Sequence, residues 1–256
     1  MHYTEAQMLE WVARFLWPLL RVGSVFVSLP VFSSHGVPIR VRLIVAVITA
    51  LVLAPVLPQP PAIELFSPEG FFTVAQEVFI GLLAGYVLQL VYATLAFSGQ
   101  IIALSMGLGF ASLLDPQTGV QVPVVAQIYL IFTTFTFLGA DGHLLLIHML
   151  ADSFHSLPIG GGIGLPAIQA LIAWTGLVFS TGLLIALPIV IVLLIVTLGL
   201  GVATRSAPQL NIFSVGFPIS LGIGLFLMWL TVPDAVHSIG HLLQESYRVL
   251  HDMLLS

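Results

Sequence analysis

The chain has 256 residues, of which 59% are hydrophobic and 7% are charged, and its mean hydropathy is +1.13. Soluble domains average about 45–50% apolar and about 25% charged residues, so this composition predicts an integral membrane protein. Its six arginines are scattered, lysine and cysteine are absent, and the net charge of −5 is dispersed, which excludes a basic nucleic-acid surface, disulfides and cysteine metal sites.

The first apolar run, residues 11–32, contains two arginines and two prolines. Arg14 and Arg21 are seven residues apart and therefore share one helical face. An arginine costs about 2.5–3.5 kcal/mol at the centre of a membrane helix, which favours burial against a partner or a position near an interface. We assign both arginines to packing between subunits. A charge that moves or gates is the alternative, although no relay partner accompanies them.

The next two apolar runs differ in length, because 43–57 is short for a span of about 20 residues and 71–104 exceeds one span. In the longer run, four residues recur at every fourth position and share a face: Glu77, Gly81, Gly85 and Gln89. Two small residues at this spacing allow another helix to approach, and Glu77 is expected to find a partner there. We assign Glu77, Gly81 and Gly85 to subunit packing. A proton-carrying Glu77 is the alternative.

The stretch 105–123 is apolar but rich in glycine and proline, and Asp115 is its only charge. Its composition predicts that no continuous helix runs through it. Irregular backbone facing lipid would leave polar groups unsatisfied at several kcal/mol each, so this stretch is expected inside protein or lining a cavity. We predict that it forms a constriction or a plug. The candidate plug residues are Met106, Gly107, Gly109, Phe110, Leu113, Leu114, Asp115, Pro116 and Gly119.

After a further helix at 124–138, aspartate and histidine residues gather in the connection that follows: Asp141, His143, Asp152 and His155. A metal site is one interpretation, but the H-E-x-x-H pattern and a third ligand at a diagnostic spacing are missing, so none is predicted. The sequence also lacks a G-x-S-x-G turn, a phosphate-binding loop and an aspartyl pair on one helix face. We therefore expect neither enzymatic activity nor a cofactor.

From residue 167 an apolar run extends to 204, with Pro188 near its middle. A continuous helix of this length would measure about 57 Å against a hydrocarbon core of ~30 Å, so it is expected to be kinked, split or projecting. The chain then reverses at 205–211, and 234–256 has the pattern of an amphipathic helix. The predicted class is all-α, a polytopic membrane protein with about six apolar segments, long kinked helices and a C-terminal helical hairpin.

Several motifs occur together in a fixed order: RVGSVFVSLPVF, P-x-R-x-R at 38–42, EVFIGLLAGY, SGQIIALSMGLGFASLLDPQTG and APQLNIFSVGFPI. Over essentially the whole chain they resemble the FliR/SctT family of type III export gates. The resemblance implies a FliP-like helical part at 1–164, with a plug loop at about 105–123, followed by a FliQ-like hairpin at 165–256. Asn211 and Pro218, which belong to the last motif, are assigned to subunit packing.

The resemblance also implies partners and a location. The gate would form with FliP and FliQ, beside FlhB and FlhA, in the inner membrane within the flagellar basal body, with part of it on the periplasmic side. Unfolded flagellar subunits would pass through it, membrane lipid would surround it, and nucleic acid is not expected. Two alternatives stay open: the injection apparatus of the same family, and an ion-coupled secondary transporter that uses Glu77 and the broken helices.

Overall fold

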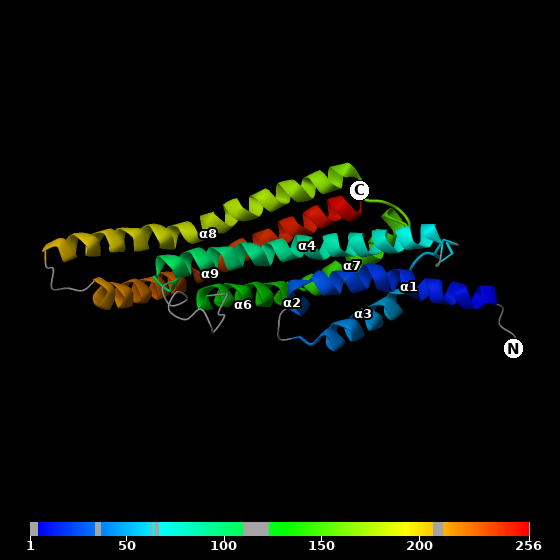
Figure 1. The fold of residues 1–256 in the computed structure, drawn as a ribbon, viewed down its shortest axis with the longest axis horizontal. Coiled ribbons are helices and arrows are strands. Elements are labelled where there is room, and N and C mark those ends of the chain that lie inside the picture. The colour runs from blue at the N-terminus through cyan, green and yellow to red at the C-terminus, as the bar shows by residue number, and fades with distance from the viewer. Residues whose placement is uncertain are drawn as a thin grey trace. The chain divides into compact units, whose positions relative to one another are not determined.

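The computed structural model describes residues 5–33, 37–61, 63–64, 67–109, 123–206 and 212–255. Every regular element within these ranges is an α-helix, which confirms the predicted all-α class (Figure 1). The helices are α1 (Glu5–Ser28), α2 (Pro30–Ser33), α3 (Ile39–Leu53), α4 (Pro68–Ser105), α6 (Val124–Gly139), α7 (Gly142–Ser156), α8 (Leu165–Ser206) and α9 (Ile212–Leu254).

Fewer helices than expected are long and apolar enough to cross a membrane. Among the described residues, α4, α8 and α9 meet this requirement, and α6 with α7 adds a fourth span if the two are counted as one broken span. The predicted count of about six apolar segments is therefore not confirmed. Helix α3 has 15 residues, which corresponds to about 22 Å and is shorter than a ~30 Å hydrocarbon core. Helix α1 contains Arg14 and Arg21, which lower its hydropathy.

Prolines interrupt the long helices less than the sequence suggested. Pro188 lies inside α8, and Pro218 and Pro233 lie inside α9, yet each helix continues through them. Helix α8 is therefore not split, and its 42 residues correspond to about 63 Å. The amphipathic tail expected at 234–256 is the C-terminal part of α9. A proline removes only its own N–H donor, so the hydrogen bonds on either side can carry the helix past it.

The chain forms two compact units. The first consists of Met1–Leu90, Asp141–Trp174 and Leu243–Ser256, and the second consists of Val91–Ala140 and Thr175–Leu242. Helices α4, α8 and α9 each contribute residues to both units. This division follows packing and differs from the predicted division of the sequence near Gly164, which stays a prediction.

In the first unit, α1 lies beside α3 (Figure 1). Val22 and Phe26 of α1 share a buried cluster with Ala46 and Leu53 of α3. Small residues on α3 allow close packing, and the larger residues fill the space between the helices. This packing holds α1 in place for the buried residues described below.

In the second unit, the C-terminal half of α4 is the central helix. It contacts α6 at Gly99, where an added Cβ would lie 2.5 Å from the Cα atom of Ala126. It contacts α8 through the buried Ser98, whose hydroxyl donates to the carbonyl oxygen of Gly182 at 2.8 Å. Taken over whole helices, 61% of the apolar stretch of α4 is buried, against 17% for α8 and 22% for α9.

Candidate functional site

The first candidate site is an ion pair that is completely buried between α1 and α4. Arg21 and Glu77 are both 0% exposed. The Arg21 Nε donates to Glu77 Oε2 at 2.7 Å, and Nη2 donates to Glu77 Oε1 at 3.0 Å. Two parallel hydrogen bonds of this kind fix the orientation of both side chains as well as their separation.

The C-terminal end of α7 supplies the other acceptors around Arg21. Nη1 donates to the carbonyl oxygen and to the hydroxyl of Ser153, both at 3.0 Å, and Nη2 donates to the carbonyl oxygen of Leu157 at 3.0 Å. The guanidinium also lies 4.1 Å from the centroid of the Phe154 ring, a cation–π contact. All five N–H donors of Arg21 therefore have acceptors. We call Arg21, Glu77, Ser153, Phe154 and Leu157 the Arg21 cluster.

Two glycines bring α4 close to α1 beside this cluster. A Cβ at Gly81 would collide with the Ser24 hydroxyl and with the backbone oxygen of Arg21. A Cβ at Gly85, one turn further along α4, would collide with the side chain of Ser28. Gly81 and Gly85, the two small residues that the sequence indicated, therefore allow α1 and α4 to approach closely. This close approach lets Glu77, on the same face of α4, reach Arg21.

The chemistry of the Arg21 cluster is that of a closed structural pair. Both carboxylate oxygens of Glu77 accept hydrogen bonds from an arginine, which remains protonated in proteins, so the geometry does not favour a proton-carrying role. Removing one member of a buried pair leaves an uncompensated charge, at a cost of about 3–5 kcal/mol. The cluster therefore fixes three helices that are distant in sequence.

The residues predicted to pack between subunits fall into three groups: some make contacts inside this chain, some are exposed, and one lies outside the described residues. Arg21 and Glu77 make contacts within one chain, as do Gly81 and Gly85. The side chains of Arg14 and Pro218 are exposed, and Asn211 lies outside the described residues. Packing between subunits stays a prediction for this set.

The second candidate site is the C-terminal end of α4. The N–H of Leu108 donates to the carbonyl oxygen of Ala103, and the N–H of Gly107 donates to that of Leu104, both at 3.0 Å. These two bonds form a Schellman motif, and Gly107 has the left-handed conformation that the motif requires, with φ of 84°. The helix therefore stops at Ser105, as the glycine-rich sequence predicted.

Helix α9 covers this end of α4. Met106 is 0% exposed, and a Cβ at Gly224 would lie 2.7 Å from its Cγ atom. A Cβ at Gly107 would lie 3.2 Å from the ring of Phe217. Of the other candidate plug residues, Gly109 is described, whereas the following lie outside the described residues: Phe110, Leu113, Leu114, Asp115, Pro116 and Gly119. The plug stays a prediction.

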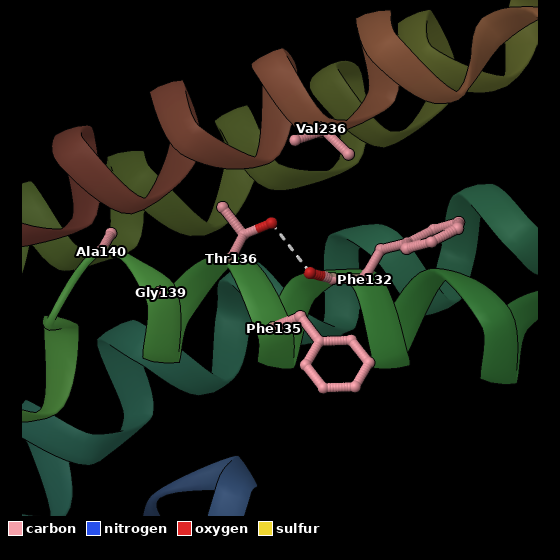
Figure 2. Close-up of a pocket in the computed structure, with 6 residues that line it drawn as sticks. All are labelled: Phe132, Phe135, Thr136, Gly139, Ala140 and Val236. Atoms are coloured by element: carbon pink, nitrogen blue, oxygen red, sulfur yellow. Dashed lines mark hydrogen bonds between the residues drawn. The ribbon is translucent and has the colours of Figure 1, made fainter.

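A shallow hollow of about 450 Å³ lies between α6 and α9 in the second unit (Figure 2). It is lined by Phe132, Phe135, Thr136, Gly139, Ala140 and Val236. Figure 2 shows the hydroxyl of Thr136 turned toward the carbonyl oxygen of Phe132, to which it donates at 2.8 Å. Apart from Thr136, whose hydroxyl is engaged in this hydrogen bond, the lining side chains are apolar or absent, and none is an acid.

The metal alternative gains no support from the structure. Within the described ranges, no three histidine, aspartate or glutamate residues lie close enough together to hold a metal ion. Asp141, His143, Asp152 and His155 belong to α7 and its N-terminal cap.

Sequence reasoning did not identify the α7 residues of the Arg21 cluster. Ser153 follows Leu146 and Leu150 at helical spacing, so it lies on the buried face of α7. The sequence signal that could have identified Ser153 is a hydroxyl-bearing residue among apolar residues at helical spacing. The carbonyl oxygens of Ser153 and Leu157 leave no signal in the sequence, because every residue has one.

The part of this chain that matches known proteins includes the residues of both candidate sites. The chain matches the family described as bacterial export proteins, family 1, over residues 12–246. It is 38% identical to the flagellar biosynthetic protein FliR of Escherichia coli K12 over 252 residues, which cover 98% of this chain and 96% of that protein.

Two further relatives carry the same name. The FliR of Pectobacterium carotovorum is 40% identical over 248 residues, with 96% of this chain and 95% of that protein covered. The FliR of Buchnera aphidicola from Acyrthosiphon pisum is 30% identical over 254 residues, with 99% and 98% covered. The chain therefore belongs to the bacterial export proteins of family 1.

Proposed function

We propose that this chain is a structural and gating subunit of the flagellar protein export apparatus in the bacterial inner membrane. The observation that carries this proposal is the similarity, over nearly the full length, to relatives named flagellar biosynthetic protein FliR within a family of export proteins. Three or four membrane-capable helices among the described residues agree with a membrane subunit. No catalytic role is part of the proposal.

The subunit assembles with FliP and FliQ, next to FlhB and FlhA, to form the conduit for unfolded flagellar subunits. Helices α8 and α9 support an assembly, because most of their apolar stretches are exposed in the single chain. Exposed apolar surface of this extent is covered by lipid or by other helices. Arg14 and Pro218 are candidates for such contacts.

The gate is passive and closes through an apolar constriction that begins at the end of α4. A narrow apolar constriction excludes water and ions, because neither finds polar partners there. The backbone freedom of Gly107 and Gly109 lets the barrier be displaced by an entering chain. The Arg21 cluster supports a fixed frame rather than an ion pathway, because its donors are all engaged.

The test removes the candidate barrier and leaves the end of α4 intact. Residues 110–118 are deleted in cells that carry the complete apparatus, and leakage of a small solute or ion is measured. Co-purification with FliP and FliQ controls for assembly, and replacement of 110–118 by a polar linker of equal length controls for shortening. Both variants are expected to leak. Unchanged leakage in assembled complexes would contradict the gate.

A further inference from the structure

Helix α9 changes its chemistry partway along its length. Residues 212–233 include no charged residue, and they correspond to about 33 Å of helix, close to the ~30 Å thickness of the hydrocarbon core of a bilayer. From position 234 onward the helix carries these ionisable residues: Asp234, His237, His241, Glu245, Arg248, His251 and Asp252. None of them is buried. The change therefore falls between Pro233 and Asp234, inside one helix.

The change occurs along one exposed face of α9. Residues of this face follow one another at alternating intervals of four and seven positions: Val215, Ile219, Phe226, Leu230, His237 and His241. The first four are apolar and 37–59% exposed, and both histidines are exposed. Because the six residues share a face, the change is not a rotation from an apolar face to a polar one. The surroundings of this face change from apolar to aqueous along the helix.

The opposite face of α9 is buried on both sides of the change. Met228 lies before it, Ala235 and Ile239 lie after it, and none of the three is more than 8% exposed. The helix therefore keeps its contacts within the chain beyond residue 233. Only the medium around the chain differs between the two parts of α9.

Two aromatic side chains lie immediately before the change. Trp229 is 71% exposed, and its ring centroid lies 6.0 Å from that of Phe226. Tryptophan is enriched where a membrane meets water, because its ring is largely apolar while its N–H can reach polar groups. An exposed tryptophan little more than one helical turn before the first charged residue is the arrangement expected at the surface of a bilayer.

Helix α8 shows that apolar exposure alone does not identify lipid. Its large exposed side chains stay apolar along its length, from Leu165 and Ile172 to Leu198 and Val202. Its 42 residues correspond to about 63 Å, twice the hydrocarbon core, so lipid alone cannot cover it. On α9 three further observations identify lipid: the length of the uncharged part, the change along a single face, and the position of Trp229.

We propose that the exposed face of α9 contacts the acyl chains of phospholipids from Val215 to Leu230, and that the membrane surface crosses the helix between Trp229 and Asp234. Trp229 lies among the headgroups, and the ionisable part of the helix lies in water. The inference does not depend on the gate. It adds to the proposed assembly that partner helices leave this face of α9 to lipid.

Spin labels on single cysteines test the lipid contact, since the chain has no cysteine of its own. Ile219→Cys, Phe226→Cys, His237→Cys and His241→Cys are labelled with a nitroxide in the assembly purified with FliP and FliQ. The assembly is reconstituted into vesicles of phosphatidylethanolamine and phosphatidylglycerol. Collisions with oxygen, which concentrates in lipid, are compared with collisions with a water-soluble nickel chelate. Oxygen should dominate severalfold at 219 and 226, and the nickel chelate should dominate at 237 and 241.

The buried face of α9 supplies the matched controls. Met228→Cys lies on the membrane side of the change and Ile239→Cys on the aqueous side, and both native side chains are buried. Labels at these two positions should collide rarely with either reagent. This pattern is the one that a position covered by protein gives.

Each contrary result overturns the inference in a different way. Rare collisions with both reagents at 219 and 226 mean that a partner protein covers this face, which leaves the proposed export function intact. Frequent collisions with the nickel chelate at 219 and 226 mean that the face borders water. A preference for oxygen at 237 and 241 means that the membrane surface does not cross α9 before Asp234.

A second measurement needs no purified assembly. In broken membranes of cells that carry the complete apparatus, a water-soluble maleimide should label His241→Cys severalfold faster than Phe226→Cys. Labelling after denaturation in detergent gives the total amount of each variant. Equal rates at the two positions overturn the boundary, whatever the outcome of the leakage test of the gate.

Discussion

Arginine suits position 21 because of the number and direction of its donors. Acceptors reach it from Glu77 on one side and from Ser153 and Leu157 on the other. A lysine would offer three donors from a single nitrogen and could not match two oxygens of a carboxylate in a planar pair while also reaching α7. The positive charge also lies beside the carbonyl end of α7, where a helix favours a cation.

The first prediction concerns the coupling of Arg21 and Glu77. Arg21→Met or Glu77→Leu alone should lower the free energy of unfolding by about 3–5 kcal/mol, because each strands a buried charge. The double variant removes both charges and should be more stable than either single variant. Denaturant titration of the purified chain in detergent measures all four proteins, and additive losses in the double variant would show that the pair is not coupled.

Exchanging the two charges provides the matched control. Arg21→Glu with Glu77→Arg restores an ion pair but turns a carboxylate toward the carbonyl oxygens of Ser153 and Leu157. We expect the exchanged protein to be less stable than the apolar double variant. Full recovery of stability on exchange would mean that α7 contributes little to the cluster.

At the scale of elements, the contact between α1 and α4 depends on backbone proximity rather than on side-chain interdigitation. The obstacle at Gly81 includes the backbone oxygen of Arg21, which cannot rotate away. The obstacle at Gly85 is mainly the side chain of Ser28. The two glycines of one motif therefore differ in how much substitution they can tolerate.

The second prediction compares Gly81 with a glycine that has no close neighbour. Gly81→Ala should destabilise the chain by about 1–2 kcal/mol net, because overpacking against a backbone oxygen costs about 2–3 kcal/mol and the gain in helix propensity is only about 1 kcal/mol. Gly240→Ala makes the same change in α9 where no atom lies within 4 Å, so it should raise the unfolding temperature. Thermal unfolding in detergent compares the two, and a stabilising Gly81→Ala would disprove the close contact.

Sequence patterns predicted those structural features that depend on residues close together in the chain. The end of α4 could be predicted because Gly107 favours the left-handed conformation that stops a helix. The partner of Glu77 could not be identified from spacing, because Arg21 lies 56 residues away and Ser153 lies 132 residues from Arg21. Of the three expectations for the apolar run 167–204, the split is wrong, since α8 is one helix with Pro188 inside it, whereas the kink stays a prediction.

At the scale of the whole molecule, α4 is the most buried of the three described helices that could cross a membrane. The apolar stretch of α4 is 61% buried within the chain, whereas those of α8 and α9 are 17% and 22% buried. Large exposed side chains on α8 include Leu184, Ile195 and Val202. Water cannot be the medium around these apolar stretches, because apolar surface of this extent would drive association.

The third prediction follows from this imbalance of burial. If the proposed assembly with FliP and FliQ forms, its helices would cover α8 and α9 and shift the equilibrium toward the folded state. The chain produced without other export proteins should then be degraded several times faster than in cells that also produce FliP and FliQ. Pulse-chase labelling measures the two half-lives. A matched variant, Gly222→Ala, should behave like the unmodified chain in both settings, since its methyl group would meet no neighbouring atom in the chain. An equally long-lived chain that accumulates a small solute alone in vesicles would instead be a transporter, and the export proposal would fail.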